Sequence, residues 1–312
     1  MAIIALFLIF GIEVFLTLQE LPVSNQAFHK WSLIDMSVLF SNPIWFYAIG
    51  FALILAQSVT ILRSAYHQVV SEQSNYLSLF FYLSLTPVVF NQGEFGSAII
   101  GLSVLTIVLR KLFYLYQVEK NYALVYDAAL LLGIGSLFYL PILLFVFLIP
   151  LALWVYKIAF PRHIIISIFG ISTPYLFYSV YLFWQDQFSW FWDCKFPNMF
   201  SFSIPNITSF TWQEISLWTG IALFGLMGAF NILRGLADRS IKQRKAYLLI
   251  MGLVLITVTG AFLTDQSLAQ HLILLCPAIT FMFTDFFIQK RKKWVSDLML
   301  CCYFGLLIIN LI

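Results

Sequence analysis

The chain has 312 residues, of which 62% are hydrophobic and 10% are charged, and its formal net charge is +3. Soluble domains are usually about 45–50% apolar and about 25% charged, so this composition excludes an ordinary soluble domain. It predicts an all-α, polytopic helical membrane protein folded as one integral membrane domain over residues 1–312. Since the basic residues lie in short clusters between apolar segments, we expect no nucleic-acid partner.

Eleven apolar runs follow one another along the chain, and most have the roughly 17–25 residues that are needed to cross about 30 Å of hydrocarbon. They lie near residues 2–18, 43–62, 75–91, 95–109, 122–139, 142–156, 164–184, 215–233, 247–264, 268–286 and 294–312. The runs at 75–91, 95–109 and 142–156 are marginal in length.

Lysine and arginine fall almost entirely in every second gap between these runs, and Lys30 and Lys195 are the two exceptions. Basic residues are retained in the cytoplasmic loops of membrane proteins. The pattern therefore predicts about eleven transmembrane helices, with the N-terminus in the cytoplasm and the C-terminus outside. Merging any two runs would place a basic cluster on the wrong side, which supports the separate counting of the marginal ones.

Two of the predicted outer segments are long. In residues 19–42, apolar side chains recur at helical spacing, which predicts a short amphipathic helix on the outer membrane face. Residues 185–214 are rich in aromatic side chains and are interrupted by Pro197 and Pro205, which predicts an interfacial loop.

Glycines inside the apolar runs, such as Gly133 and Gly135, are expected to let helices approach closely in lipid. Pro141 is expected to end one helix at Leu140 and to start the next almost at once, so that the two helices form an antiparallel hairpin.

Ionisable residues inside the spans are functional candidates because an aspartate at a helix centre costs about 2.5–3.5 kcal/mol. Glu13 and Asp127 are the two intramembrane polar candidates, each needing a partner or a water-filled cleft. Asp285 and Asp297 are expected to reach the inner interface and to pair with the basic cluster at 290–293.

The first predicted outer segment carries the candidate chemistry. Glu20 and Asp35 are candidate catalytic residues, since a carboxylate at the lip of a membrane cleft can act as a general base or hold a divalent metal against a phosphate. His29 and Lys30 are candidates for binding the substrate. The cysteine spacing does not match a zinc site, so no metal ligands are assigned. No cofactor is expected, except that the carboxylates of the outer segments could bind a divalent metal.

Residues 125–141, the stretches 160–163 and 170–175, and the segments 276–287 and 290–294 resemble a family of polytopic inner-membrane proteins found in Bacteroidota. The resemblance covers most of the chain. It implies a bacterial inner membrane with the odd-numbered gaps facing the periplasm, but the family has no assigned activity and so implies no chemistry.

The order of elements is also similar, more loosely, to the GT-C superfamily of glycosyltransferases that use polyprenyl-phosphate-linked sugars. In those enzymes the first helix is followed by a long outer loop with an interfacial helix and an acidic residue near its start, a layout that 19–42 fits with Glu20 or Asp35 as the base. The paired Asp-Glu motif and the large periplasmic domain of those enzymes are not found in this sequence.

Three functions follow as hypotheses. The first is a GT-C-like transferase that acts on a lipid-linked sugar at the periplasmic face, with Lys30 holding its phosphate groups. The second is a non-catalytic subunit or scaffold of a cell-envelope complex, with the loop 185–214 contacting other envelope membrane proteins. The third is a transporter or flippase in which Glu13 and Asp127 face a shared polar path. Membrane lipid is a partner in all three.

Overall fold

The computed structural model describes residues 43–65, 76–91, 97–117, 121–158, 160–190, 212–263, 273–288 and four residues further on, 300, 301, 303 and 305. Within these residues the chain is helical and contains no strand, which confirms the all-α prediction. Glu13 and the whole segment 19–42, with Glu20, His29, Lys30 and Asp35, lie outside the described residues.

Each long described helix coincides with one of the predicted apolar runs. The helices are α3 (Pro43–Ser64), α4 (Leu77–Asn91), α5 (Ser97–Tyr114), α6 (Tyr122–Phe138), α7 (Leu148–Tyr156), α8 (Phe160–Trp184), α10 (Trp212–Gly235), α11 (Ile241–Leu263) and α13 (Cys276–Ile288). Shorter elements are η2 (Leu115–Gln117), η3 (Leu140–Phe147), α9 (Phe188–Trp190), η7 (Leu236–Asp238) and η8 (Ile273–Leu275).

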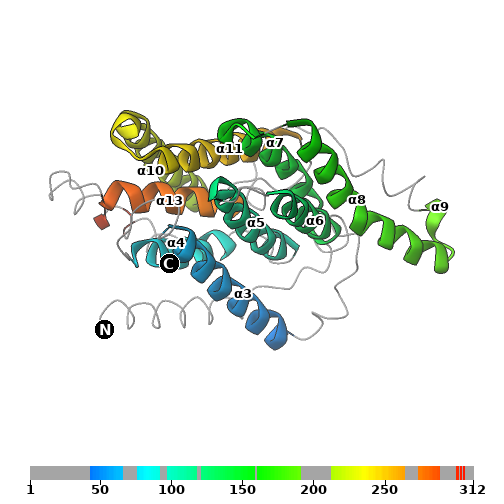
Figure 1. The fold of residues 1–312 in the computed structure, drawn as a ribbon. Helices are drawn as coiled ribbons and strands as arrows, with labels where there is room; N and C mark the ends of the chain where they lie inside the picture. Colours follow the sequence, from blue (N-terminus) through cyan, green and yellow to red (C-terminus); the bar gives the residue numbers. More distant parts are fainter. Residues whose placement is uncertain are drawn as a thin grey trace.

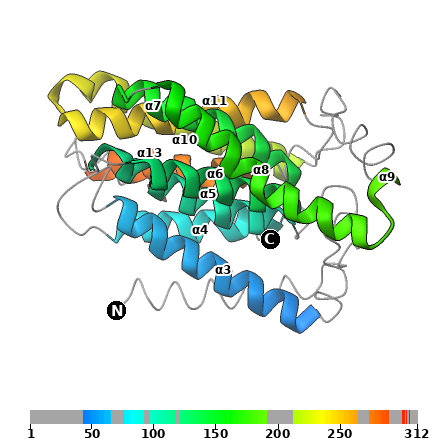
Figure 2. The same cartoon turned by 45° about the vertical axis from the view of Figure 1, so that its right-hand side comes forward.

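The helices run side by side as one bundle (Figure 1). α7, α10 and α11 lie on one side, α3 and α4 lie on the opposite side, and α5, α6 and α13 lie between them (Figure 2). α8 packs against α6 along the outside of the bundle. The core is a continuous apolar cluster whose largest fully buried members include Tyr82, Tyr139, Phe113, Phe145 and Phe281.

Three described segments are long and apolar enough to cross a membrane: Pro161–Trp184, Thr219–Asp238 and Ile241–Ala261. Only 17% of the apolar window in α8 and 28% of that in α10 are buried, so both helices leave wide apolar faces uncovered. Side chains such as Phe177 and Leu226 are about two-thirds exposed. An apolar face of that size needs a hydrocarbon solvent, and these helices therefore indicate a membrane protein.

The predicted tight turn at Pro141 is present, two residues earlier than expected. α6 ends at Phe138, and η3 begins at Leu140 with Pro141 in its first turn. The segment continues as a 3₁₀-helix to Phe147 before it becomes the α-helix α7. Pro150 follows this stretch and has no amide hydrogen to donate to the carbonyl of Val146, so the α-helical hydrogen bond to that carbonyl is missing at the end of the stretch.

Small residues bring the backbones of α6 and α8 into contact, as the glycine pattern predicts. A Cβ atom added to Gly133 would lie 2.9 Å from the carbonyl oxygen of Ile171, and one added to Gly170 would lie 2.8 Å from that of Tyr126. Gly170 faces Ala129 and Gly133 faces Pro174, so each helix presents two small or flat residues one turn apart. This is the arrangement by which transmembrane helices gain van der Waals contact without a hydrophobic driving force.

Candidate functional site

Contacts between described residues gather the helix ends that carry basic residues at one end of the bundle, which we call the basic end. Lys111 near the end of α5 pairs with Asp127 near the start of α6. Lys245 near the start of α11 lies over Tyr156 at the end of α7. The turn between α10 and α11 marks this end, at the left of Figure 2.

The opposite end is apolar where the described residues meet. Leu137 and Leu140, on either side of the α6–η3 turn, pack with Leu182 from the last turn of α8, and Tyr175 and Tyr178 cover them. The start of α3 and the short α9 lie on this side, at the right of Figure 2. The two ends of the bundle therefore differ in charge.

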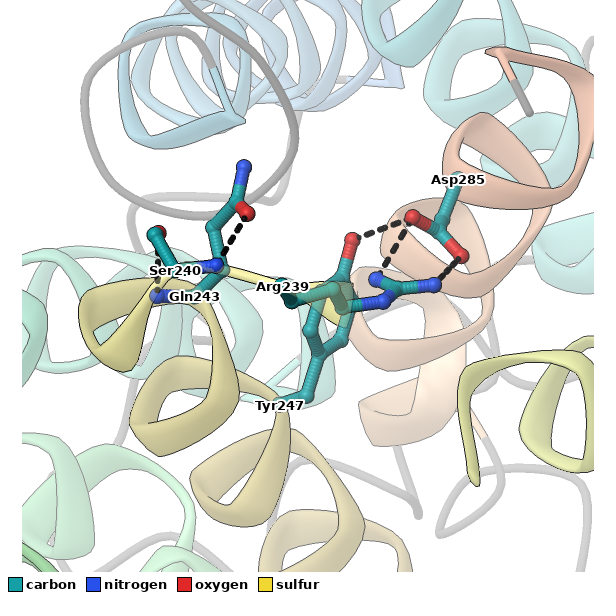
Figure 3. A network of polar contacts seen from close by, with 5 residues as sticks. All are labelled: Arg239, Ser240, Gln243, Tyr247 and Asp285. Atoms are coloured by element: carbon teal, nitrogen blue, oxygen red, sulfur yellow. Dashed lines mark hydrogen bonds and ion pairs between the residues drawn. The ribbon is translucent and has the colours of Figure 1, made fainter. Parts of the chain in front are cut away.

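A buried ion pair at the basic end is the strongest polar site among the described residues. Arg239 follows η7 and precedes α11, and its Nη1 and Nη2 atoms donate to Oδ1 and Oδ2 of Asp285 at 2.7 and 2.6 Å (Figure 3). The side chains of Arg239 and Asp285 keep 8% and 4% of their exposure. Two parallel charge-assisted hydrogen bonds between side chains that are this deeply buried form a strong and directional contact.

Tyr247 completes the site from α11. Its hydroxyl donates to Oδ1 of Asp285 at 2.7 Å, and its ring lies under the guanidinium of Arg239, 4.3 Å from the ring centroid to Cζ. Burial lowers the pKa of Arg239, but hydrogen bonding to Asp285, followed by the electrostatic influence of Tyr247 and Asp285, outweighs burial and raises the pKa above its ordinary value. Arg239 therefore stays cationic, and one carboxylate joins the turn before α11 to the last part of α13.

The start of α11 positions Arg239. Ser240 and Gln243 form a capping box, in which the amide of Gln243 donates to Oγ of Ser240 at 3.4 Å and the amide of Ser240 donates to Oε1 of Gln243 at 3.3 Å (Figure 3). Nε of Arg244 donates to the carbonyl oxygen of Arg239 at 2.9 Å. These bonds fix the backbone directly after Arg239, so its side chain enters the bundle in a defined direction.

The sequence predicts Asp285 at the basic side of the membrane, with the cluster at 290–293 as its partner, and that cluster lies outside the described residues. The partner that the structure shows is Arg239, from the preceding basic segment. The sequence does contain one signal for this: Ser240 and Gln243 have the spacing of a capping box, which marks Arg239 as the residue just before a helix.

Asp127 has a different environment. Its Oδ2 accepts a hydrogen bond from Nζ of Lys111 at 2.8 Å, and the two side chains keep 50% and 27% of their exposure, respectively. Exposed pairs of this kind contribute about 0–1 kcal/mol. The candidate intramembrane residue Asp127 is therefore half-exposed and paired at the basic end.

Other buried polar groups also link one helix to another. Gln57 of α3 accepts a hydrogen bond from the Tyr82 hydroxyl at 2.6 Å and donates to Ser103 of α5. His163 of α8 shares a 2.7 Å hydrogen bond with Asn121, the residue before α6. These contacts hold α3, α4 and α5 together and α6 against α8.

The described residues contain no group of three or more histidine, cysteine, aspartate or glutamate side chains that could hold a metal ion. The candidate catalytic and substrate-binding residues of the segment 19–42 lie outside the described part of the chain. What this part offers chemically is a set of polar contacts that fasten helices to one another.

The chain was compared with protein-family models, with curated proteins and with solved structures, and none of these matches it.

Proposed function

We propose that the chain is a multi-pass protein of a bacterial inner membrane with about eleven transmembrane helices, with its N-terminus in the cytoplasm and its C-terminus in the periplasm. The support is the gathering of Lys111, Arg239 and Lys245 at one end of the bundle, which is the end that positive charge would keep in the cytoplasm. Fusion of a phosphatase that is active only in the periplasm tests the orientation. A fusion after Gly235 should be inactive and a fusion after Gln187 active, and the reverse result would overturn the topology.

We propose that this protein serves as a non-catalytic membrane subunit of a cell-envelope complex. The observation that carries the proposal is the use of the buried polar groups: Asp285, Gln57 and His163 each bind a side chain of a neighbouring segment. In membrane proteins, buried polar groups mark substrate or ion pathways when they face a cavity. Groups that bind one another across helix junctions instead hold a bundle in one shape, which is what a scaffold requires.

The contact surface would be the aromatic segment 185–214. Two large aromatic side chains stand near its ends: Trp184, at the end of α8, directly precedes the segment, and Trp212, at the start of α10, belongs to it. They are 85% and 87% exposed. Both belong to the end of the bundle opposite the basic end. Large exposed aromatic side chains are typical anchors of protein contacts.

Co-purification from native membranes in mild detergent tests this role. The wild-type chain should retain a stoichiometric partner, and the double variant Trp184→Ser, Trp212→Ser should lose it. Trp154→Ser is the matched control, because Trp154 is 73% exposed but lies near the basic end, on α7. A chain that purifies alone, and that forms no cross-links to a neighbour in intact membranes, would contradict the proposal.

A GT-C-like transferase is the second candidate, and one feature favours it. α3 begins at Pro43, at the end of the bundle away from the basic residues, and carries Arg63 in its last turn. Glu20 or Asp35 would then act as the base at the periplasmic face, with Lys30 and His29 at the phosphate groups of a lipid-linked sugar and with a divalent metal if one is required.

Glu20→Gln and Asp35→Asn, expressed at normal levels, should each reduce or abolish the glycolipid or glycan product in this case. If both variants produce as much as wild type, the transferase assignment is wrong. A transport role is not proposed. Of the two acidic residues that were expected to line a polar path, the structure describes Asp127, and this residue is paired with Lys111 at the basic end.

A further inference from the structure

Three elements meet around one lysine at the basic end. Nζ of Lys245, near the start of α11, lies 4.6 Å from the ring centroid of Tyr116 in η2 and 5.8 Å from that of Tyr156 at the end of α7. The two rings lie 5.8 Å apart and are tilted by 36°. Lys245 thus rests on an aromatic pair formed by segments about forty residues apart in the sequence.

The charge of this lysine is available to a ligand. Among the described residues, the ion pairs are those of Lys111 and Arg239, and no carboxylate lies within ion-pair distance of Lys245. The ring faces attract the ammonium group and hold it in place. An ammonium group has three N–H donors, so it can face the rings and still donate to an anion.

A second lysine directly follows one residue of this aromatic pair in the chain. Lys157 directly follows Tyr156, is exposed, and has the left-handed backbone angle φ 58° that glycine usually adopts at the end of a helix. Its amide donates to the carbonyl of Trp154, and the amide of Ile158 donates to that of Leu153, so this is a complete Schellman ending. A lysine at this position carries a conformational cost that glycine would remove.

Apolar surface continues from the lysines along the same segment. Trp154 and Phe147 are 73% and 65% exposed. A ligand at this place would therefore meet positive charge first and then apolar and aromatic surface. Anionic lipids offer this order, and basic pockets between helices on the cytoplasmic side of membranes bind their headgroups.

We propose that Lys245 and Lys157, together with Tyr116 and Tyr156, bind the phosphate headgroup of an anionic phospholipid from the leaflet that faces the basic end. Nζ of each lysine donates to phosphate oxygens, the tyrosine pair holds Lys245 in place, and the acyl chains lie along Phe147 and Trp154. The site depends on the protein being in a membrane but not on its role as a subunit or an enzyme.

Native mass spectrometry of the full chain in an uncharged detergent tests the site, with phosphatidylglycerol as the probe and phosphatidylcholine as the neutral comparison. One phosphatidylglycerol should bind more tightly than the rest. Lys245→Gln should weaken this binding about tenfold, because a charge-assisted contact is lost, whereas Lys245→Arg should retain it. Arg63→Gln removes one exposed charge from the end of α3 and should change binding less than twofold.

Lys157→Gly distinguishes an effect on lipid binding from an effect on the stability of the fold. Glycine suits the left-handed angle, so this variant should unfold at the same or a higher temperature without lipid, yet bind phosphatidylglycerol several-fold more weakly. Equal binding by wild type, Lys245→Gln and Lys157→Gly would overturn the site while leaving the membrane topology and the subunit role untouched. Equal binding of phosphatidylcholine, or stabilisation by inorganic phosphate at the same concentration, would show that no anionic lipid is recognised and would also overturn it.

Discussion

Two helix junctions of this bundle are held together by opposite means. α6 and α8 meet through Gly133 and Gly170, where one backbone lies directly against the other. The turn before α11 meets α13 through the charges of Arg239 and Asp285, which are almost completely buried. The first junction combines this close packing with hydrogen bonds between neutral groups, such as that of Tyr126 and Thr173. The second depends on charges, and a buried charge that loses its counterion is costly. The charged junction is therefore the more vulnerable to a single substitution, although the glycine junction is the more closely packed.

The largest effect is expected from breaking the buried ion pair. Asp285→Ala should lower the free energy of unfolding by about 3–5 kcal/mol, because it leaves the guanidinium of Arg239 buried without a counterion. Thermal or denaturant unfolding in detergent measures this. Asp127→Ala is the matched control, since it breaks an ion pair whose side chains are 27% and 50% exposed, and it should cost about 0–1 kcal/mol. Equal losses in the two variants would show that burial does not distinguish the pairs.

The pair can also be replaced as a unit. The double variant Arg239→Met, Asp285→Leu removes both charges and should recover most of the stability that Asp285→Ala loses, because neither residue then needs a partner. If the double variant is as unstable as the single one, the loss comes from packing and not from the unpaired charge.

A smaller effect is expected from the third member of the site. Tyr247→Phe keeps the ring under Arg239 but removes the hydroxyl that donates to Asp285, and it should cost about 1.5–3 kcal/mol, the range for hydrogen bonds to charged groups. Tyr126→Phe is the control, because its hydroxyl meets the neutral hydroxyl of Thr173 at 3.2 Å, and about 0.5–1.5 kcal/mol is expected. Comparison of the unfolding midpoints of the two variants checks the difference.

Most of the helix order could be predicted from the sequence, because apolar length and basic spacing are local properties. The runs at 43–62, 122–139 and 215–233 each match a described helix within a few residues. The 3₁₀ stretch before Pro150 was missed, because hydrophobicity does not distinguish a 3₁₀-helix from an α-helix. Close approach at Gly133 was predicted, but its partner, Gly170, was not.

The polar site was only partly predictable, for a physical reason. The sequence shows that Asp285 stands on the basic side, but several basic segments lie there, and sequence distance favours the cluster at 290–293 over Arg239. Which cation reaches the carboxylate depends on the packing of α11 against α13, a contact between elements distant in the chain. The spacing of Ser240 and Gln243 was the one local signal that could have indicated Arg239.

The glycine junction should respond to added volume. Gly170→Ala places a methyl group 2.8 Å from both the Cβ of Ala129 and the carbonyl oxygen of Tyr126, and overpacking of this kind should cost about 1–3 kcal/mol. Gly225→Ala is the matched control, because nothing lies within 4 Å of its added Cβ, and it should be neutral or stabilise α10 by up to about 1 kcal/mol. A stability gain in both variants would show that α6 and α8 can separate without loss.

The smallest effect is expected from the helix cap that positions Arg239. Ser240→Ala removes the oxygen that accepts a hydrogen bond from the amide of Gln243, and it should lower the free energy of unfolding by about 1 kcal/mol. Ser172→Ala, at an exposed position inside α8, should leave the free energy of unfolding almost unchanged. If the cap acts by holding the backbone beside Arg239, its loss also weakens the ion pair, so part of its cost disappears once Asp285 is gone. Ser240→Ala combined with Asp285→Ala should then lose less than the sum of the single variants, by about 0.5 kcal/mol or more. Simple additivity would mean that the cap stabilises α11 alone and that α13 holds Arg239 without its help.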